Sequence, residues 1–187
     1  MARVIGNPTL VVLSGPPGAG KTTLAHALAR RLGCPAICRD EIKEGMVHAA
    51  PGFVAAIGDD LTMRTLPTFF GVLELLLTAG VTTVAEAAFQ NRIWTPRLEP
   101  LRHLAHLRIV HCDIDAAVAW ARIRRRAQDH PLRQAHADLP HTDVAAHAAS
   151  HARFDAVSLP APAMRVDTSD GYRPGLDAVV AFVNGTP

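Results

Sequence analysis

Short apolar runs alternate along this chain with longer segments whose apolar residues recur about every three or four positions. Five of these runs are predicted strands, at residues 9–14, 35–38, 81–85, 107–112 and 164–166. The first run shows no polar alternation, which is typical of a central strand covered on both faces. Because strands alternate with helices throughout, the pattern predicts an α/β fold in which helices cover both faces of a parallel sheet.

Helices are predicted between the runs, and glycine or proline marks several of their ends. Five of them are predicted at residues 22–32, 60–78, 94–103, 142–154 and 174–183. Another begins at residue 39 and is broken at 51–52, and another is capped at residue 115 and continues through residue 126. Gly33 and Gly80 are stop signals, and an aspartate at 59 or 60 is the expected cap of the long apolar helix. Pro67 should kink that helix or lie in its first turn.

The first strand leads into a glycine-rich loop with the pattern G-x-x-x-x-G-K-T, and a predicted helix follows it. In this context successive backbone N–H groups form a nest for phosphate oxygens, helped by the helix N-terminus. Lys21 is expected to reach the β- and γ-phosphates of ATP or GTP, and the Thr22 hydroxyl to bind Mg²⁺. The predicted nucleotide contacts in this P-loop are Gly15, Pro16, Pro17, Gly18, Ala19, Gly20, Lys21, Thr22 and Thr23.

Acidic residues follow the second and third predicted strands, where a parallel sheet binds its ligands. Asp40 could accept the proton of an attacking hydroxyl, and its alternative role is that of an N-cap or first-turn aspartate of the following helix. Glu86 could hold Mg²⁺ through water or bind the acceptor, and its alternative is an ion pair with Arg92. Lys43, one turn after Asp40, could neutralise an anionic substrate, or it could simply be solvated.

A basic segment lies on the helix that follows the fourth strand. Arg122 and Arg126 are four residues apart and therefore share one helix face. An arginine pair on a mobile lid would stabilise the charge of a transferring phosphoryl group, so we predict a lid over about residues 122–140. The alternative is an exposed basic face.

Composition narrows the class of protein further. With 187 residues, 49% of them hydrophobic, the chain is expected to form one domain over residues 1–187. A net charge of +2 and 5% aromatic residues do not favour a nucleic-acid partner. Three cysteines indicate a reducing compartment. The apolar stretches fall short of a membrane span and no signal peptide is evident, so a soluble, cytoplasmic protein without a membrane partner is expected.

The histidines do not predict a metal centre. His147 and His151 form an i,i+4 pair, but the flanking residues do not supply the H-E-x-x-H pattern or a cysteine partner. Cys34 and Cys38 have the wrong spacing for a zinc knuckle. Mg²⁺ at Thr22 is therefore the metal that the sequence predicts.

The P-loop and the segment Arg39-Asp40-Glu41-Ile42-Lys43 together resemble the small P-loop kinases of the nucleotide-kinase class. The resemblance is strongest to the branch of 5′-hydroxyl polynucleotide kinases, zeta toxins and chloramphenicol phosphotransferases. It implies that Asp40 is the general base and that Lys43 holds substrate phosphate. Lysine replaces the arginine of the polynucleotide kinase segment, and lysine binds phosphate without bidentate geometry.

The resemblance extends over the layout of nearly the whole chain. It implies a three-layer fold with a five-stranded sheet in the order 2-3-1-4-5. In the lid, it implies that Arg122 stacks on the base and that Arg126 meets the transferred phosphate. Glu86 stands where many relatives carry aspartate, and the segment 166–168 resembles the one that lines the base pocket.

These observations favour an ATP- or GTP-dependent phosphotransferase that acts on a hydroxyl of a small metabolite, nucleoside or antibiotic. The long apolar helix at 60–78, with the loop at 52–58, could wall the acceptor pocket, and its alternative is plain core packing. The first alternative function is a 5′-hydroxyl kinase of nucleic acid, which the modest charge and few aromatics disfavour. The second is an ATPase module of the AAA type, which would need a further helical lid domain. A degenerate nucleotide-binding protein is disfavoured by the intact Lys21 and Thr22.

Overall fold

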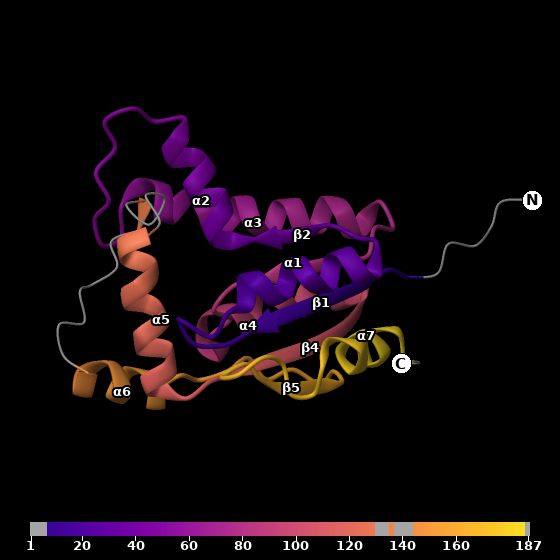
Figure 1. The fold of residues 1–187 in the computed structure, drawn as a ribbon. Helices are drawn as coiled ribbons and strands as arrows, with labels where there is room; N and C mark the ends of the chain where they lie inside the picture. Colours follow the sequence, from indigo (N-terminus) through magenta and orange to yellow (C-terminus); the bar gives the residue numbers. More distant parts are fainter. Residues whose placement is uncertain (1–6, 130–134, 137–143, 186–187) are drawn as a thin grey trace, which may run out of the picture.

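The computed structural model describes residues 7–129, 135–136 and 144–185. Within these residues, five strands form one parallel sheet in the order β2-β3-β1-β4-β5 (Figure 1). The strands are β1 (Thr9–Ser14), β2 (Ala36–Cys38), β3 (Thr83–Glu86), β4 (His106–Asp113) and β5 (Ala163–Asp167). All four strand pairings are parallel, which confirms the predicted fold class and the strand order that the resemblance implied.

The helices lie between the strands, as the sequence pattern predicts. They are α1 (Lys21–Leu32), α2 (Arg39–His48), α3 (Asp60–Thr78), α4 (Asn91–Leu98), α5 (Ala116–Asp129), α6 (Val144–Ala152) and α7 (Leu176–Asn184). The helix expected over 94–103 begins earlier, at Asn91, and tightens into the 3₁₀ segment η1 (Glu99–His103). Pro100 in the first turn of η1 cannot donate the α-helical hydrogen bond, which accounts for the change.

Two apolar cores lie on opposite faces of the sheet because β1 alternates its side chains between them. Val11 and Leu13 face α1 and α7, where they meet residues such as Leu28. Leu10 and Val12 face α3 and α4, and pack in a cluster of fully buried side chains that includes Phe69, Leu73, Phe89 and Leu98. Figure 1 shows the helices of the two faces enclosing the sheet. β1 is therefore the central strand that its unbroken apolar run predicts.

The expectation that every apolar stretch is too short to span a membrane does not hold for the long helix α3. Among the described residues, it is long and apolar enough to cross a membrane by length and composition alone. Phe69, Leu73 and Leu77 on this helix are buried in the core of one sheet face, and the helix of a packed core meets the same criterion. Asp59 caps its first turn through the Thr62 N–H at 2.7 Å, and Pro67 lies within it.

The carboxyl ends of three neighbouring strands lie at one level. Glu86 at the end of β3 is in register with Leu13 of β1 and with Cys38 of β2. The P-loop follows β1 and α2 follows β2, so both begin beside Glu86. In Figure 1, α5 stands beyond this edge of the sheet and extends from α6 towards α2. The sheet thereby gathers the chemically significant residues at one edge.

Candidate active site

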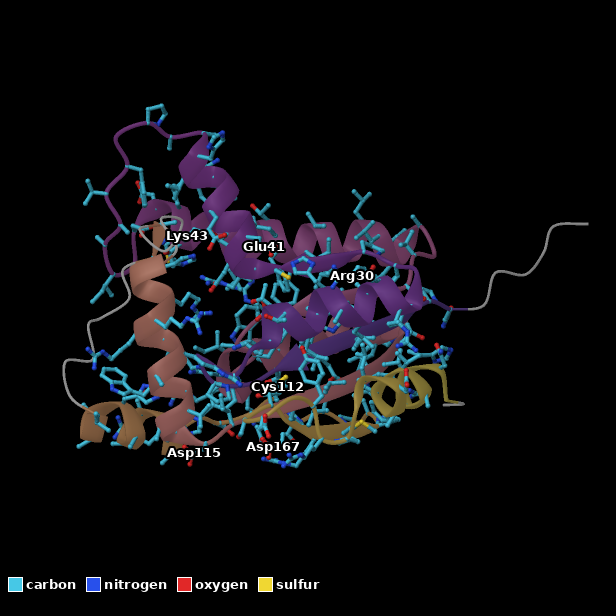
Figure 2. The ribbon with its side chains drawn as sticks, viewed as in Figure 1. Arg30, Glu41, Lys43, Cys112, Asp115 and Asp167 are labelled. Carbon is cyan, nitrogen blue, oxygen red and sulfur yellow. The ribbon has the colours of Figure 1, made fainter. Side chains whose placement is uncertain are left out.

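The P-loop is fixed in place by close backbone contacts on both sides. A Cβ atom at Gly15 would lie 2.6 Å from the carbonyl oxygen of Cys112, the β4 residue labelled in Figure 2. A Cβ atom at Gly18 would lie 2.7 Å from the carbonyl oxygen of Ala119 on α5, and Gly18 has a φ of 82°. Neither distance is compatible with a side chain, so both glycines allow α5 and β4 to press directly against the loop.

The start of α1 presents the two polar side chains of the motif. Lys21 Nζ donates to the carbonyl oxygen of Pro16 at 3.0 Å, so the ammonium lies over its own loop. The Thr22 hydroxyl donates to Glu86 Oε2 at 3.0 Å. Gly20 precedes the helix in the left-handed conformation and contributes no capping side chain. The first-turn N–H groups and the ammonium together suit a phosphate group.

Glu86 is a carboxylate inside the protein, with 4% of its surface exposed. Burial raises the pKa of Glu86 above its ordinary value, the neighbouring Lys21 ammonium opposes that rise, and the negative charge of Asp40 adds to it. Such a carboxylate is costly unless a cation or hydrogen-bond donor faces it. The Thr22 hydroxyl and the Lys21 ammonium are those partners. The alternative role of Glu86, an ion pair with Arg92, is not among the ion pairs of the described residues.

Asp40 lies in the first turn of α2, directly after the end of β2. Its carboxylate accepts a hydrogen bond from Arg39 Nη1 at 3.0 Å, and 45% of the side chain is exposed. The N-cap of α2 is Cys38 rather than Asp40, and that cap makes no side-chain hydrogen bond. Asp40 is therefore the first-turn aspartate of the structural alternative and not the N-cap.

One cavity of about 760 Å³ brings most of the predicted site residues together. Its lining includes Pro17, Gly18, Gly20, Lys21, Thr22, Thr23, Asp40, Glu86 and Arg126. Gly15 and Pro16 instead line a second cavity, of about 500 Å³, beside β4. Ala19 is fully buried, with its carbonyl oxygen accepting from the Thr168 hydroxyl at 2.9 Å. The P-loop, the strand-end acids and one lid arginine thus face a common space.

Lys43 does not line this cavity, and its position does not fit the substrate-binding role expected for it. Its ammonium donates to Asp59 Oδ2 at 2.8 Å, and the side chains of this pair are only 3% and 6% exposed. Figure 2 labels Lys43 on α2. Burial opposes ionisation of Asp59, but the ammonium and the backbone N–H groups of Thr62 and Ala56 hold its pKa well below the ordinary range. Lys43 joins α2 to the first turn of α3.

The two lid arginines have different surroundings. Arg122 Nη2 donates to the carbonyl oxygens of Thr168 and Ser169 at 2.8 and 3.0 Å, which joins α5 to the loop after β5. Arg122 does not line the large cavity, whereas Arg126, one turn later, does. Of the predicted lid, residues 130–134 and 137–140 lie outside the described part of the chain. His136 contacts Glu44 of α2 at 3.3 Å.

The long helix 60–78 lines the far wall of the cavity, as the sequence suggested, but the contribution of α4 was not predicted. This wall is formed by α3 and α4 and is lined by Thr62, Met63, Leu66, Pro67, Gln90, Ile93, Trp94 and Arg97. Met63 and Ile93 are 67% and 53% exposed, so apolar surface faces the cavity from this side. A helical spacing of exposed apolar residues was the available signal, but it does not identify which surface the helix faces. Arg39, beside Asp40, also lines the cavity.

A comparison with protein families assigns this chain to a family. The sequence profile of the family described as "AAA domain" (AAA_33) matches residues 10–156. The chain belongs to this AAA-domain family. The match includes the P-loop, all residues of the described cavity and the whole of α5.

Solved structures share the fold across nearly the whole chain. A protein of Chloroflexus aurantiacus j-10-fl, described only as a candidate kinase, is 24% identical with a TM-score of 0.81 over 95% of this chain and 97% of its own. The Mycobacterium tuberculosis APS kinase, solved with AMPPNP and APS, is 14% identical with a TM-score of 0.61 over 96% and 99%. A Sinorhizobium meliloti gluconokinase is 17% identical with a TM-score of 0.56 over 95% and 92%. These similarities confirm the fold of small P-loop kinases.

The curated relatives are much longer proteins. The replication factor C large subunit of Pyrobaculum arsenaticum is 30% identical over 117 residues, which is 51% of this chain and 26% of that protein. The same subunit of Pyrobaculum aerophilum is 29% identical over 55% of this chain and 28% of its own length. This chain therefore spans about a quarter of the length of these relatives, and the match concerns one segment.

Proposed function

We propose that the protein is a nucleoside triphosphate-dependent phosphotransferase that moves the γ-phosphoryl group of ATP or GTP to a hydroxyl of a small molecule. One observation carries the proposal: the Lys21 ammonium, the Asp40 and Glu86 carboxylates and the Arg126 side chain line the same cavity. Phosphoryl transfer needs a phosphate-binding loop, a proton acceptor and a cationic group in one space. The described site contains a side chain suited to each task.

In the proposed reaction, the acceptor hydroxyl oxygen forms a bond to the γ-phosphorus while the bond from that phosphorus to the β–γ bridging oxygen breaks. Asp40 takes the hydroxyl proton, and the products are a phosphate ester and a nucleoside diphosphate. The Arg39 guanidinium donates a hydrogen bond to the Asp40 carboxylate at 3.0 Å and orients it for this role. Lys21 and Arg126 stabilise the negative charge that spreads over the transferring phosphoryl oxygens.

The residues present suit Mg²⁺, which prefers oxygen ligands. The Thr22 hydroxyl and the Glu86 carboxylate lie 3.0 Å apart at the start of α1, and Glu86 is buried with a cationic neighbour in Lys21. We assign Thr22 as the direct ligand and Glu86 as the group that holds a metal-bound water. When bound, Mg²⁺ would neutralise phosphate charge.

The α3–α4 wall supports a small acceptor that has both apolar and polar parts. Met63, Leu66 and Trp94 supply apolar surface, while Gln90 and Arg97 supply hydrogen-bond donors within the same lining. A pocket of this composition binds the body of a small molecule and orients a few polar groups. The structural relatives include proteins named as gluconokinase and APS kinase, which supports this acceptor class.

Two other functions have specific support. The similarity to replication factor C favours an ATPase module, which would hydrolyse the nucleotide without an organic acceptor. A likeness of fold to the Pnkp1/Rnl/Hen1 RNA repair complex, with a TM-score of 0.58 over 78% of this chain, favours a polynucleotide kinase. The apolar wall and the net charge of +2 favour the small-molecule kinase over both.

The test is nucleoside diphosphate release from ATP or GTP, measured with and without added acceptors. Sugars, nucleosides, phenicol- or aminoglycoside-type alcohols and 5′-hydroxyl oligonucleotides form the panel, and γ-labelled nucleotide identifies the labelled product. We expect turnover to require a small hydroxyl compound. Turnover that is equally fast without any acceptor would contradict the kinase proposal and favour the ATPase module.

Asp40→Asn tests the proton acceptor within this assay. We expect kcat to fall by about 10²–10⁴-fold, while nucleotide affinity changes little, because the lost group acts on the hydroxyl proton. Glu74→Gln is the matched control, since Glu74 is an exposed carboxylate of α3 that does not line the cavity. An Asp40→Asn variant with wild-type kcat would remove Asp40 from the mechanism without affecting the P-loop assignment.

A further inference from the structure

Three potential metal ligands from consecutive elements meet at one point next to α1. His26 lies on α1, Cys38 ends β2, and Glu41 lies in the first turn of α2. The imidazole nitrogen, the sulfur and a carboxylate oxygen all lie within 4.8 Å of one another. His26 Nε2 is 2.7 Å from Glu41 Oε1 and 3.8 Å from Cys38 Sγ. Figure 2 labels Glu41 where the start of α2 approaches α1.

These separations suit a tetrahedral ion. Zinc bonds of about 2.0 Å to nitrogen or oxygen and about 2.3 Å to sulfur place neighbouring ligand atoms roughly 3.3–3.7 Å apart. The nitrogen–sulfur distance of 3.8 Å is close to that range. The nitrogen–oxygen distance of 2.7 Å would lengthen slightly as an ion replaces the hydrogen bond. Side-chain rotation of the half-exposed Glu41 is sufficient for this adjustment.

The site has both a protected ligand and a path from solvent. Cys38 is 2% exposed, whereas the side chains of His26 and Glu41 are each 44% exposed. A surface hollow of about 450 Å³, lined by His26, Arg30 and Cys34 among others, opens beside the histidine. The Glu86 and Glu41 carboxylates both face the Cys38 thiol, so negative charge surrounds the sulfur. That charge favours a cation at this point.

A simple ion pair accounts for less of this arrangement. Contact between His26 and Glu41 would join α1 to α2, but it does not explain why Cys38 Sγ, which also packs in the core, lies 3.8 Å from the same nitrogen. Imidazole, thiolate and carboxylate are together the ligand set that zinc uses in proteins, and Mg²⁺ does not favour sulfur. The cluster therefore differs in chemistry from the Thr22–Glu86 pair.

We propose that His26 Nε2, Cys38 Sγ and the Glu41 carboxylate bind one Zn²⁺ ion or a similar borderline divalent ion. Three protein ligands leave a fourth position for water. Binding bonds the ion to the Cys38 thiolate and releases the thiol proton to solvent. Occupancy would hold the first turn of α2 against α1, and Asp40 lies in that turn. The proposal is independent of the phosphotransferase assignment, because the metal site uses none of the proposed catalytic residues.

Cobalt substitution tests the site directly. We expect the full-length protein to bind one equivalent of Co²⁺ with a thiolate-to-cobalt charge-transfer band, and Zn²⁺ to displace it. Cys38→Ser should abolish that band and weaken Zn²⁺ binding by at least about 100-fold, and Glu41→Gln should weaken it by about tenfold. Cys34→Ser is the matched control, because Cys34 lies outside the three-ligand cluster and should leave the band intact.

Other outcomes would overturn the proposal. Wild-type protein without a thiolate band would do so, as would a band that survives Cys38→Ser or disappears in Cys34→Ser. Circular dichroism checks that each variant is folded. If Cys38→Ser does not fold, Glu41→Gln decides the matter, because the half-exposed Glu41 can be replaced without disturbing the core; unchanged Zn²⁺ affinity in that variant would exclude the site.

Discussion

The two ends of the central cavity are built in different ways. At the phosphate end, backbone atoms determine the shape: Gly18 lies against the carbonyl oxygen of Ala119, with no room for a side chain. At the opposite end, side chains determine the shape, and Met63 and Ile93 present exposed apolar surface from α3 and α4. The first end can recognise the phosphate groups shared by all nucleotides. The second can differ greatly between proteins of the same fold.

This difference explains why the nucleotide end is easier to assign than the acceptor end. Phosphate binding depends on N–H groups, a lysine and a helix N-terminus, all of which follow one another in sequence. Acceptor binding depends on which side chains two separate helices bring to one wall. The proposed function therefore has a specific donor and only a class of acceptor. The variants below act on the two ends separately.

The largest expected effect is at the phosphate end. Lys21→Ala should lower kcat/KM for phosphoryl transfer by about 10³-fold, because the ammonium neutralises charge on the transferring group. Thermal denaturation should show a retained fold, because the hydrogen bond of Lys21 Nζ is to its own loop, at Pro16, and Thr22 still donates to the buried Glu86. Near-normal turnover would contradict the assignment of this end of the cavity to phosphate binding.

Arg126 is expected to have the next largest effect. Arg126→Ala should slow transfer by about 10²-fold through the loss of a charge facing the cavity. Arg124→Ala is the matched control, because Arg124 is exposed on the same helix and does not line the cavity. Equal rates for the two variants would show that the basic helix acts as a general surface rather than through one residue.

Replacing Glu86 is expected to change activity and thermal stability in opposite directions. Its folded-state pKa lies above the ordinary value of 4.5, so the unfolded chain loses this proton first as the pH rises. The free energy of unfolding therefore falls as the pH rises above about 4.5, and this contribution of Glu86 reaches its full size above the folded-state pKa. Glu86→Gln should lower activity by about tenfold, raise its Mg²⁺ requirement, and raise Tm at pH 7 by about 2–4 °C.

The sign of that Tm difference is the critical measurement. The advantage of Glu86→Gln should shrink as the pH is lowered through 4.5, because both states of the wild type are then protonated. Thermal melts of the two proteins between acidic and neutral pH check this expectation. A variant that is less stable than wild type at pH 7 would show that the buried carboxylate stabilises the fold.

The smallest effect is expected at the acceptor end. Met63→Ala should raise KM for the acceptor by about tenfold and leave KM for the nucleotide unchanged, since the side chain lies on the α3 wall. Leu75→Ala is the matched control: Leu75 is 70% exposed on the same helix and does not line the cavity. A change in nucleotide KM instead would place the nucleotide, rather than the acceptor, against α3.

The sequence by itself determined the features that depend on neighbouring residues. The alternation of strands and helices, the P-loop and the place of Asp40 after β2 follow from local patterns, and the structure shows each of them. Local signals suffice here because the carboxyl ends of parallel strands meet at one edge whatever the connecting segments contain. The strand order that the resemblance to small P-loop kinases implied is also confirmed.

Tertiary structure alone decided which side chains face one another across distant segments. It paired Lys43 with Asp59 instead of a substrate, and directed Arg122 to the loop after β5. It also added α4 to the cavity wall that α3 forms, and brought His26 beside Cys38 and Glu41. These outcomes depend on how helices pack and rotate against the sheet, which the order of residues in one helix does not specify.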